Sequence, residues 1–312
     1  MYGAIEFGET KTHVAVGEGQ KYAAPVRIDT SEPATTVAAA RGASRSLSGS
    51  ANRLDGIGIA SFGSLDISDG TLLDTPKTGW SGAAILDPFA VAFGCPVRCD
   101  TDVNAAAIAE GLWGSTVGLG SHAYLTIGTG VGVGIAVDGR PVHGQMHPEA
   151  GHIIPRLQPN DTFGGVCRWH NSCFEGLISG PAVLSPCGFD PADLEADAPI
   201  WELVGDYVGK LAAIVALTTS VEAVVVSGGV GRRPAVLAAA RTSFRIELGG
   251  YLPRAVTSSA PEFLRAAELD DYSGLLGALT LGSGMNPNLR TFANIGGPWR
   301  EYRLIRPTKY LS

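Results

Sequence analysis

A short run of cysteines and histidines has the spacing of a metal site. Cys167, His170 and Cys173 form the pattern C-x-x-H-x-x-C. Two thiolates and an imidazole this close together can occupy three corners of a tetrahedral zinc site. His152 is the expected fourth ligand, and the other nearby candidates are His143 and His147. With four protein ligands the zinc would be structural, although a chance grouping of soft residues is the alternative.

Asp102 is a candidate general base. It lies between an expected strand at 97–99 and an alanine-rich helix at 104–112. A carboxylate at the end of a strand in an open α/β sheet projects into the cleft. There it can accept the proton of an attacking hydroxyl, as in phosphoryl transfer. The alternative is that Asp102, or its neighbour Asp100, only caps the helix, and the residues alone leave both interpretations open.

Two turns rich in glycine and threonine could bind phosphate. The first carries Gly8, Thr10 and Lys11, and the second carries Thr129 and Gly130. Backbone N–H groups in such turns can surround an anion, and a hydroxyl or an ammonium adds further donors. Neither turn is a Walker A loop, because the G-x-x-x-x-G-K-[ST] pattern does not occur. For each turn taken alone, a tight β-hairpin without a ligand is the alternative.

The two turns belong to an internal duplication. The strand, turn and strand of residues 4–17 recur over residues 125–137, and each copy continues into an acidic-glycine turn. Two similar halves would place the two turns opposite each other across a cleft. The expected domains are a small α/β lobe over 1–112 and a large α/β lobe with the zinc loop over 113–287. The tail from about 288 to 312 is a candidate to return to the small lobe.

Strands and helices alternate along the chain. Further strands are expected at 56–60 and 221–226, and further helices at 34–45, 180–184, 192–194, 200–219, 233–244 and 274–281. This alternation predicts an α/β fold with mostly parallel sheets. The polar residues 286–312 lack clear periodicity and give no expected element.

Length and composition limit the class of protein. The chain has 312 residues, of which 45% are hydrophobic, so it can build one large domain or two medium ones. Its net charge of −7 argues against a nucleic-acid partner. No apolar run reaches the roughly 20 residues of a membrane span, and no basic signal segment occurs, so the cytoplasm is expected. Five cysteines, an odd number, argue against a disulfide framework.

Two acids lie close to the predicted zinc ligands. Glu149 precedes His152 by three residues, and Glu175 follows Cys173 by two. A carboxylate next to a rigid metal centre is well placed to bind sugar hydroxyls. Solvated loop acids are the alternative.

Taken together, these segments resemble the ROK family of sugar kinases. That family has a duplicated actin-like ATPase fold of the hexokinase type, which is ribonuclease H-like, with two lobes around a cleft. The matching segments cover most of the chain and are 6–11, 102–107, 127–132, 149–152, 167–176, 179–182 and 227–230. Glu6, the 75–80 run and the C-x-x-H-x-x-C pattern are most similar to the family's bacterial fructokinases.

The resemblance implies ATP-dependent phosphorylation of a hexose at its 6-hydroxyl, most closely fructose to fructose 6-phosphate. Asp102 would be the base, and the sugar would be held by Asn104, Glu149, His152 and Glu175. The nucleotide would be held by Gly8, Thr10, Lys11, Thr129, Gly130, Gly180, Gly228 and Gly229. The implied cofactors are ATP with Mg²⁺, with Glu6 in the outer shell of the magnesium ion, and one structural Zn²⁺. Relatives suggest a homodimer.

Two residues depart from the family pattern. Glu9 replaces the usual second glycine of the first turn and is expected to bring an acid near the phosphates. Thr101 replaces an asparagine that contacts sugar in many members, which leaves the preferred sugar open. The alternatives are a glucokinase or mannokinase, a catalytically inactive sugar-binding or regulatory member, and a DNA-binding repressor of the family. The acidic charge and the start of the first hairpin at residue 4 disfavour the repressor.

Overall fold

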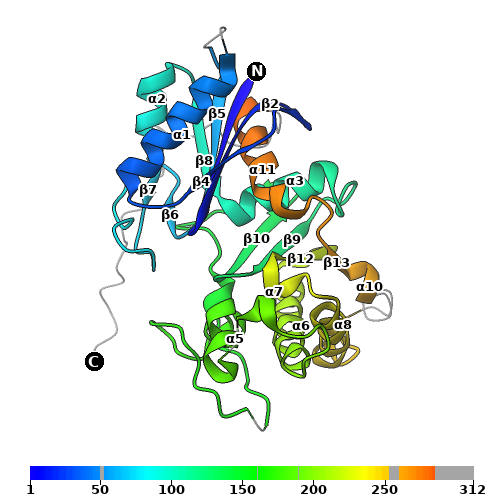
Figure 1. Cartoon of the computed structure of the whole chain (residues 1–312). Helices are drawn as coiled ribbons and strands as arrows, with labels where there is room; N and C mark the ends of the chain where they lie inside the picture. The colour runs from blue at the N-terminus through cyan, green and yellow to red at the C-terminus, as the bar shows by residue number, and fades with distance from the viewer. Residues whose placement is uncertain (50–52, 160, 189, 253–259, 285–312) are drawn as a thin grey trace, which may run out of the picture.

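The computed structural model describes residues 1–49, 53–159, 161–188, 190–252 and 260–284. Two mixed sheets with their helices form two lobes, one above the other in Figure 1. The predicted return of the tail at 288–312 lies outside the described residues. In the part of the chain that is described, no helix has the length and apolar character needed to cross a bilayer.

The first sheet has the strand order β3-β2-β1-β5-β8, and β4 also pairs with β2. Its strands are β1 (Tyr2–Phe7), β2 (Lys11–Glu18), β3 (Lys21–Tyr22), β4 (Val26–Asp29), β5 (Gly56–Ser61) and β8 (Val97–Thr101). Alternate residues of β1 face two different cores, because Ile5 packs in one buried cluster and Ala4 in another. Helix α1 (Pro33–Ser48) contributes to the first cluster and α11 (Ser273–Ser283) to the second.

The second sheet repeats the same arrangement with the order β11-β10-β9-β12-β13. Its strands are β9 (His122–Ile127), β10 (Val131–Val137), β11 (Arg140–Pro141), β12 (Ala223–Ser227) and β13 (Leu264–Ala266). Helices α6 (Ile200–Thr219) and α8 (Pro234–Leu248) pack on one face. The matching order confirms the predicted duplication. The prediction of mostly parallel sheets was wrong, because each half begins with an antiparallel hairpin.

Helices α3 (Asp102–Trp113) and α11 lie between the two sheets (Figure 1). Their backbones approach closely, since a Cβ at Gly277 would lie 1.9 Å from the carbonyl oxygen of Ala105. On the other side, a Cβ at Gly58 would lie 1.8 Å from the carbonyl oxygen of Ala278. The predicted boundaries assign α11 to the second lobe, but it packs on the first sheet. The division at residue 112 otherwise stays a prediction.

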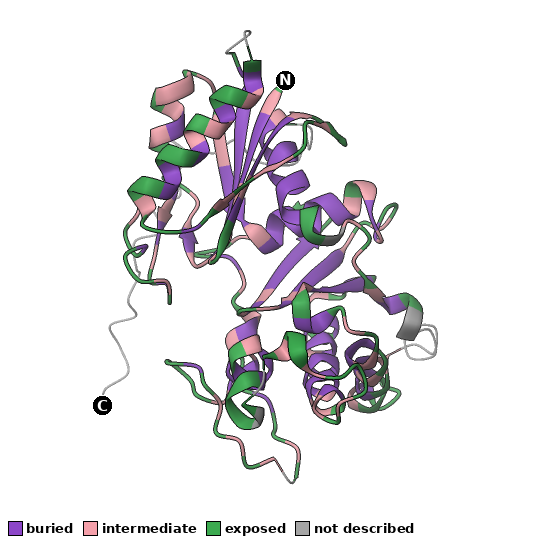
Figure 2. Cartoon of the chain, in the orientation of Figure 1, coloured by how far each residue is buried: buried purple, intermediate pink, exposed green. Residues whose placement is uncertain are grey.

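The remaining elements are short. They are β6 (Leu65–Asp66), β7 (Thr71–Leu72), α2 (Asp87–Phe93), η2 (Ala150–His152), α4 (Phe174–Ile178), α5 (Gly180–Cys187), η3 (Pro191–Asp193), α7 (Gly228–Gly231), α10 (Ala260–Phe263) and η4 (Asp270–Tyr272). The helix expected at 192–194 is thus a 3₁₀ turn. Figure 2 shows that the buried residues concentrate in the two sheets and in the helices packed against them.

One buried carboxylate ties together the two places where the chain passes between lobes. Glu110, at 0% exposure, lies near the end of α3. Its Oε2 accepts hydrogen bonds from the backbone N–H (2.8 Å) and hydroxyl (3.1 Å) of Ser115, in the first crossing. Its Oε1 accepts from the N–H of Glu268 (3.2 Å), the N–H of Leu269 (3.1 Å) and the hydroxyl of Ser273 (3.2 Å), in the second. Both chain segments that connect the two lobes are therefore hydrogen-bonded to the side chain of Glu110.

Replacing Glu110 with Ala should destabilise the protein by about 3 kcal/mol or more, because several buried donors would lose their acceptor at once. The free energy of unfolding, measured with urea, tests this. Glu202→Ala, at an exposed position on α6, is the matched control and should change it by less than about 0.5 kcal/mol. A Glu110→Ala protein as stable as this control would contradict the structural role.

Candidate active site and metal centre

Two cavities meet at Asp102. The smaller has a volume of about 240 Å³, and the larger has a volume of about 580 Å³. Asp102 and Val103 line both. Of the predicted nucleotide-binding residues, the larger cavity is lined by Gly8, Thr10, Lys11, Gly228 and Gly229. Of the predicted sugar-binding and turn residues, the smaller is lined by Thr129, Gly130, Glu149, His152 and Glu175.

The junction of β8 and α3 presents Asp102 to these cavities. Thr101 caps the helix, because its hydroxyl accepts a hydrogen bond from the N–H of Asn104 at 3.2 Å. Asp102 is the first residue of the helix and is half-buried. Its Oδ1 accepts from the N–H of Val103 at 2.8 Å. Since Thr101 is the cap, capping does not account for Asp102, and its carboxylate is available at the meeting point of the two cavities.

The surroundings of Asp102 raise the pKa of its carboxyl to about 7. Burial is the main cause, and the negative charge of Glu6 is the next. The hydrogen bond from Val103 lowers the pKa, whereas the charges of Glu9 and Glu149 add to the increase. A carboxyl with a pKa this close to neutrality is well matched to general base chemistry.

Asn104, predicted to bind sugar, lies behind the cavity wall. It is 1% exposed, and its amide donates to Oδ1 of Asp100 at 2.8 Å. Asp100 also accepts from the N–H of Thr101 at 2.8 Å and lies 3.1 Å from Nε2 of His143. This buried network connects the start of α3 to the loop after β11. The structure therefore gives Asn104 a supporting position and no place on the wall of either cavity.

The two glycine turns close in similar ways. The N–H of Gly8 donates to the carbonyl of Lys11 at 2.9 Å, and the N–H of Gly128 donates to the carbonyl of Gly130 at 2.9 Å. Gly180 lines neither cavity. Its N–H donates to the carbonyl of Gly128 at 2.7 Å, so the start of α5 supports the second turn.

Glu9 was expected near the phosphates, beside Thr10 and Lys11. In the structure it lines the smaller cavity, while Thr10 and Lys11 line the larger one. The first turn therefore contributes to both cavities: Gly8, Thr10 and Lys11 line the larger one, and Glu9 lines the smaller one. The second turn lines the smaller cavity through Thr129 and Gly130, so residues of both turns meet there, as the duplication predicts.

Glu6 offers a buried carboxylate oxygen to the larger cavity. Its Oε2 is buried and has no hydrogen-bond partner among the described residues, and it lies 3.4 Å from Nδ1 of His13. A buried carboxylate oxygen without a donor is suited to a hydrated cation, and Mg²⁺ prefers oxygen ligands and retained waters. The donor set fits an outer-shell magnesium contact.

The four predicted metal ligands come together. The donor atoms of His152, Cys167, His170 and Cys173 all lie within 4.8 Å of one another. Nδ1 of His152 lies 3.7 Å from the sulfur of Cys167 and 3.6 Å from that of Cys173, and Nδ1 of His170 lies 3.9 Å from the sulfur of Cys167. Tetrahedral zinc, with bonds of about 2.3 Å to sulfur and about 2.1 Å to nitrogen, separates such donors by about 3.6 Å.

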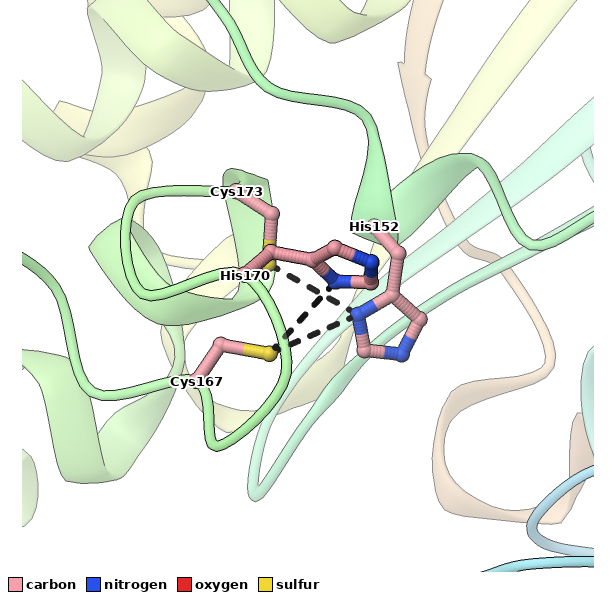
Figure 3. A group of neighbouring side chains, drawn as sticks. All are labelled: His152, Cys167, His170 and Cys173. Atoms are coloured by element: carbon pink, nitrogen blue, oxygen red, sulfur yellow. Dashed lines mark hydrogen bonds between the residues drawn. The ribbon is translucent and has the colours of Figure 1, made fainter.

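Figure 3 shows both sulfurs and one nitrogen of each ring turned toward a common point. The structure thus brings together four Cys and His side chains with the donor atoms and spacing that a tetrahedral metal site requires. The alternative ligands, His143 and His147, lie elsewhere, because His143 pairs with Asp100 and His147 with Glu149.

Two of the predicted metal ligands lie in or directly before the elements that carry His152 and Glu175. His152 ends η2, which packs tightly on β10, since a Cβ at Gly151 would lie 2.0 Å from the carbonyl oxygen of Val131. Cys173 immediately precedes α4, which carries Glu175. Oε2 of Glu175 accepts from the N–H of Val131 at 3.2 Å. A metal ion bound here would link η2 and α4 on either side of the start of β10.

Glu149 is held as an ionised acceptor. Burial alone would raise the pKa of its carboxyl, but the hydrogen bond and charge of His147, the hydroxyl of Ser64 and the charge of His152 leave the pKa below its ordinary value. Its Oε1 accepts from Ser64 at 2.8 Å and contacts Nε2 of His147 at 2.9 Å. Ser64 belongs to the first lobe, so this contact crosses the cleft.

Several cavity residues were not predicted. Ser64, Asp74, His147 and Trp169 all line the smaller cavity. Asp74 directly precedes the 75–80 run of the family resemblance, and this position was the one feature of the sequence that could have predicted a place in the cavity. Oδ2 of Asp74 accepts a hydrogen bond from Nη2 of Arg168 at 2.9 Å, which is a second contact between the lobes.

The duplicated sheets and the cleft around Asp102 define a two-lobed α/β protein of the actin-like ATPase fold. The model of the ROK family matches residues 2–284, and the chain belongs to that family.

The chain is 35% identical to a fructokinase of Zymomonas mobilis over 294 residues, covering 90% of this chain and 96% of the relative. It is 31% identical to a fructokinase of Pediococcus pentosaceus over 287 residues, covering 90% and 97%. The crystal structure of a ROK hexokinase from Thermus thermophilus superposes with a TM-score of 0.77 at 27% identity, covering 91% of this chain and 98% of that one.

Proposed function

We propose that this protein is an ATP-dependent hexose kinase that phosphorylates fructose at its 6-hydroxyl. One observation carries the proposal: the carboxylate of Asp102 lies where a small cavity lined by hydroxyl-binding groups meets a larger cavity lined by a glycine turn and Lys11. The relatives named fructokinase at 35% and 31% identity favour fructose among the hexoses.

The sugar lies in the smaller cavity and ATP in the larger one. Asp102 accepts the proton of the sugar's 6-hydroxyl while the oxygen of that hydroxyl forms a bond to the γ-phosphorus of ATP. The bond from that phosphorus to the β–γ bridging oxygen breaks, and ADP leaves with the electron pair. Glu149 and Glu175 accept hydrogen bonds from other hydroxyls and orient the sugar. Asn104 acts indirectly, through Asp100.

The first turn binds the nucleotide phosphates through Gly8, Thr10 and Lys11, and Gly228-Gly229 support the adenosine side. Thr129 and Gly130, next to Asp102, donate to the phosphoryl group in transfer. Magnesium would be held by the phosphates and water with Glu6 in its outer shell, and it supplies neutralisation of phosphate charge. Zinc would be held by the four Cys and His ligands and supplies rigidity to the loop that carries His152 and Glu175.

ADP release over a panel of fructose, glucose and mannose tests the activity. We expect ATP-dependent turnover that is fastest with fructose. A higher kcat/KM for glucose or mannose would move the protein to the glucokinase or mannokinase class. Absence of turnover with every hexose would support the sugar-binding or regulatory alternative.

The activity should depend on pH through Asp102. Only the ionised carboxylate accepts a proton, and its pKa is about 7. The value of kcat/KM for the sugar should therefore rise with pH, reach half its maximum near pH 7 and level off above. Steady-state rates at saturating ATP between about pH 5 and pH 9 measure this. A kcat/KM that stays constant over this range, as the ordinary carboxyl pKa of 3.8 would give, would contradict the assigned environment.

We further propose that the protein works in the cytoplasm as a homodimer with no nucleic-acid or membrane partner. The net charge of −7 supports the first exclusion. Light scattering of the purified protein tests the dimer.

A further inference from the structure

Acids outnumber the other titratable residues in the lining of the smaller cavity. Its lining includes five carboxylates and, among the described residues, no lysine or arginine; the acids are Glu9, Asp74, Asp102, Glu149 and Glu175. The larger cavity differs, since its lining includes Lys11, Arg27 and Arg232. Glu6, Asp102 and Asp271 line the larger cavity as well, so it presents charges of both signs, whereas the smaller cavity presents carboxylates and the imidazoles of His147 and His152.

Glu9 is the acid whose place the sequence did not predict. It lies half-buried on the turn between β1 and β2, in the first lobe. Glu175 lies in the second lobe, on the wall of the same cavity. Burial raises the pKa of Glu9, and the negative charge of Glu175 raises it further, while Lys77 lowers it. Both carboxylates therefore line one cavity of about 240 Å³, whose lining includes no lysine or arginine among the described residues.

We propose that the smaller cavity selects its sugar by charge and that Glu9 sets this selection. A hexose that carries an ammonium group in place of a hydroxyl should bind at least as well as the neutral hexose. A ligand donor between Glu9 and Glu175 offsets their repulsion, and an ammonium offsets more of it than a hydroxyl because it carries a full opposite charge. The substrate class then extends from neutral hexoses to amino-hexoses. This inference rests on the proposed function only in placing the sugar in this cavity.

Dissociation constants measured by calorimetry at pH 7 test the inference without requiring turnover. Two matched pairs isolate the charge: D-glucose with D-glucosamine, and D-fructose with 1-amino-1-deoxy-D-fructose. The observable is the affinity of the amino sugar divided by that of its neutral parent. Glu9→Gln keeps the size of the side chain and removes its charge. It should lower this ratio about tenfold in the pair that binds better, within the range expected for one charge pair near a protein surface.

Glu18→Gln is the matched control, because Glu18 is an exposed glutamate at the far end of β2 and lines neither cavity. It should leave the ratio at the wild-type value. Raising the ionic strength should shrink the wild-type ratio toward that of Glu9→Gln, since salt screens the attraction.

A Glu9→Gln protein with the wild-type ratio overturns the inference, and so does a wild-type protein that binds the neutral sugar more tightly than the amino sugar in both pairs. The proposed function fails separately: charge-dependent binding without ADP release from any hexose would refute the kinase activity and leave the selection by Glu9 standing.

Discussion

The Asp102→Asn protein should turn over its best hexose roughly 10²–10⁴ times more slowly than wild type, the contribution typical of a general base. Asparagine has the same shape but cannot accept the proton. The helix should still form, because its cap is Thr101, whose hydroxyl accepts from Asn104 at 3.2 Å. The loss should therefore appear in kcat, measured as ADP release, with a melting temperature no lower than that of the wild type, because the neutral amide removes the cost of a buried carboxylate.

The binding of ATP separates this loss from a general disturbance of the cleft. Asp102 is a negative charge next to the phosphates, so its removal should leave the dissociation constant of ATP unchanged or slightly lower. Asp138→Asn is the matched control, because Asp138 is exposed at the distant end of β10 and has a φ of 51°, which asparagine adopts readily. Wild-type turnover in Asp102→Asn would refute the assigned base.

Replacement of Cys173 with Ala should remove the bound metal and loosen the wall of the smaller cavity. Metal analysis should find about one zinc per wild-type chain and close to none in the variant. The melting temperature should fall. A metal whose free concentration is about 1,000 times its dissociation constant stabilises the folded chain by about 4 kcal/mol, and the variant loses this contribution.

The sugar should be affected more than the nucleotide. A metal ion bound at this site would position His152 and Glu175, which line the smaller cavity, while the larger cavity is lined by residues of the first hairpin and the turn at 228–229. We expect KM for the sugar to rise about tenfold or more, by analogy with the loss of supporting contacts at metal sites, with little change in KM for ATP.

Cys95→Ala is the control for this experiment, because Cys95 is a free cysteine outside the metal site. It should keep the zinc and the wild-type KM for sugar. A wild-type protein that is stable and active without any metal would contradict the zinc assignment, whatever the effect of Cys173→Ala.

Local sequence patterns predicted the parts of the structure that depend on neighbouring residues. The two hairpins follow from apolar runs broken by glycine and threonine, and their repetition predicted the duplicated sheets. The C-x-x-H-x-x-C pattern predicted that Cys167, His170 and Cys173 would come together, because its spacing is local. His152 was found as well, since it lies within the same glycine-rich loop.

Features that depend on distant contacts were not predicted. The boundary after residue 112 gave no sign that α11 would return to the first sheet. The side chain of Asn104 was expected in the cavity, but a single turn of helix decides whether it faces the sugar or Asp100. Glu9 and Thr10 are adjacent in sequence yet line different cavities. The types of the two residues do not indicate which cavity each one lines.

The return of α11 has a consequence for how the protein is made. One face of the first sheet, which includes Ala4, Ala15 and Ala60, is covered by Leu275, Ala278 and Leu279. The ribosome completes the last strand of that sheet at Thr101, but the cover, α11, begins only at Ser273. The second half therefore emerges while the first still has an open apolar side, and the nascent N-terminal segment reaches its final form only after nearly the whole described chain has been synthesised.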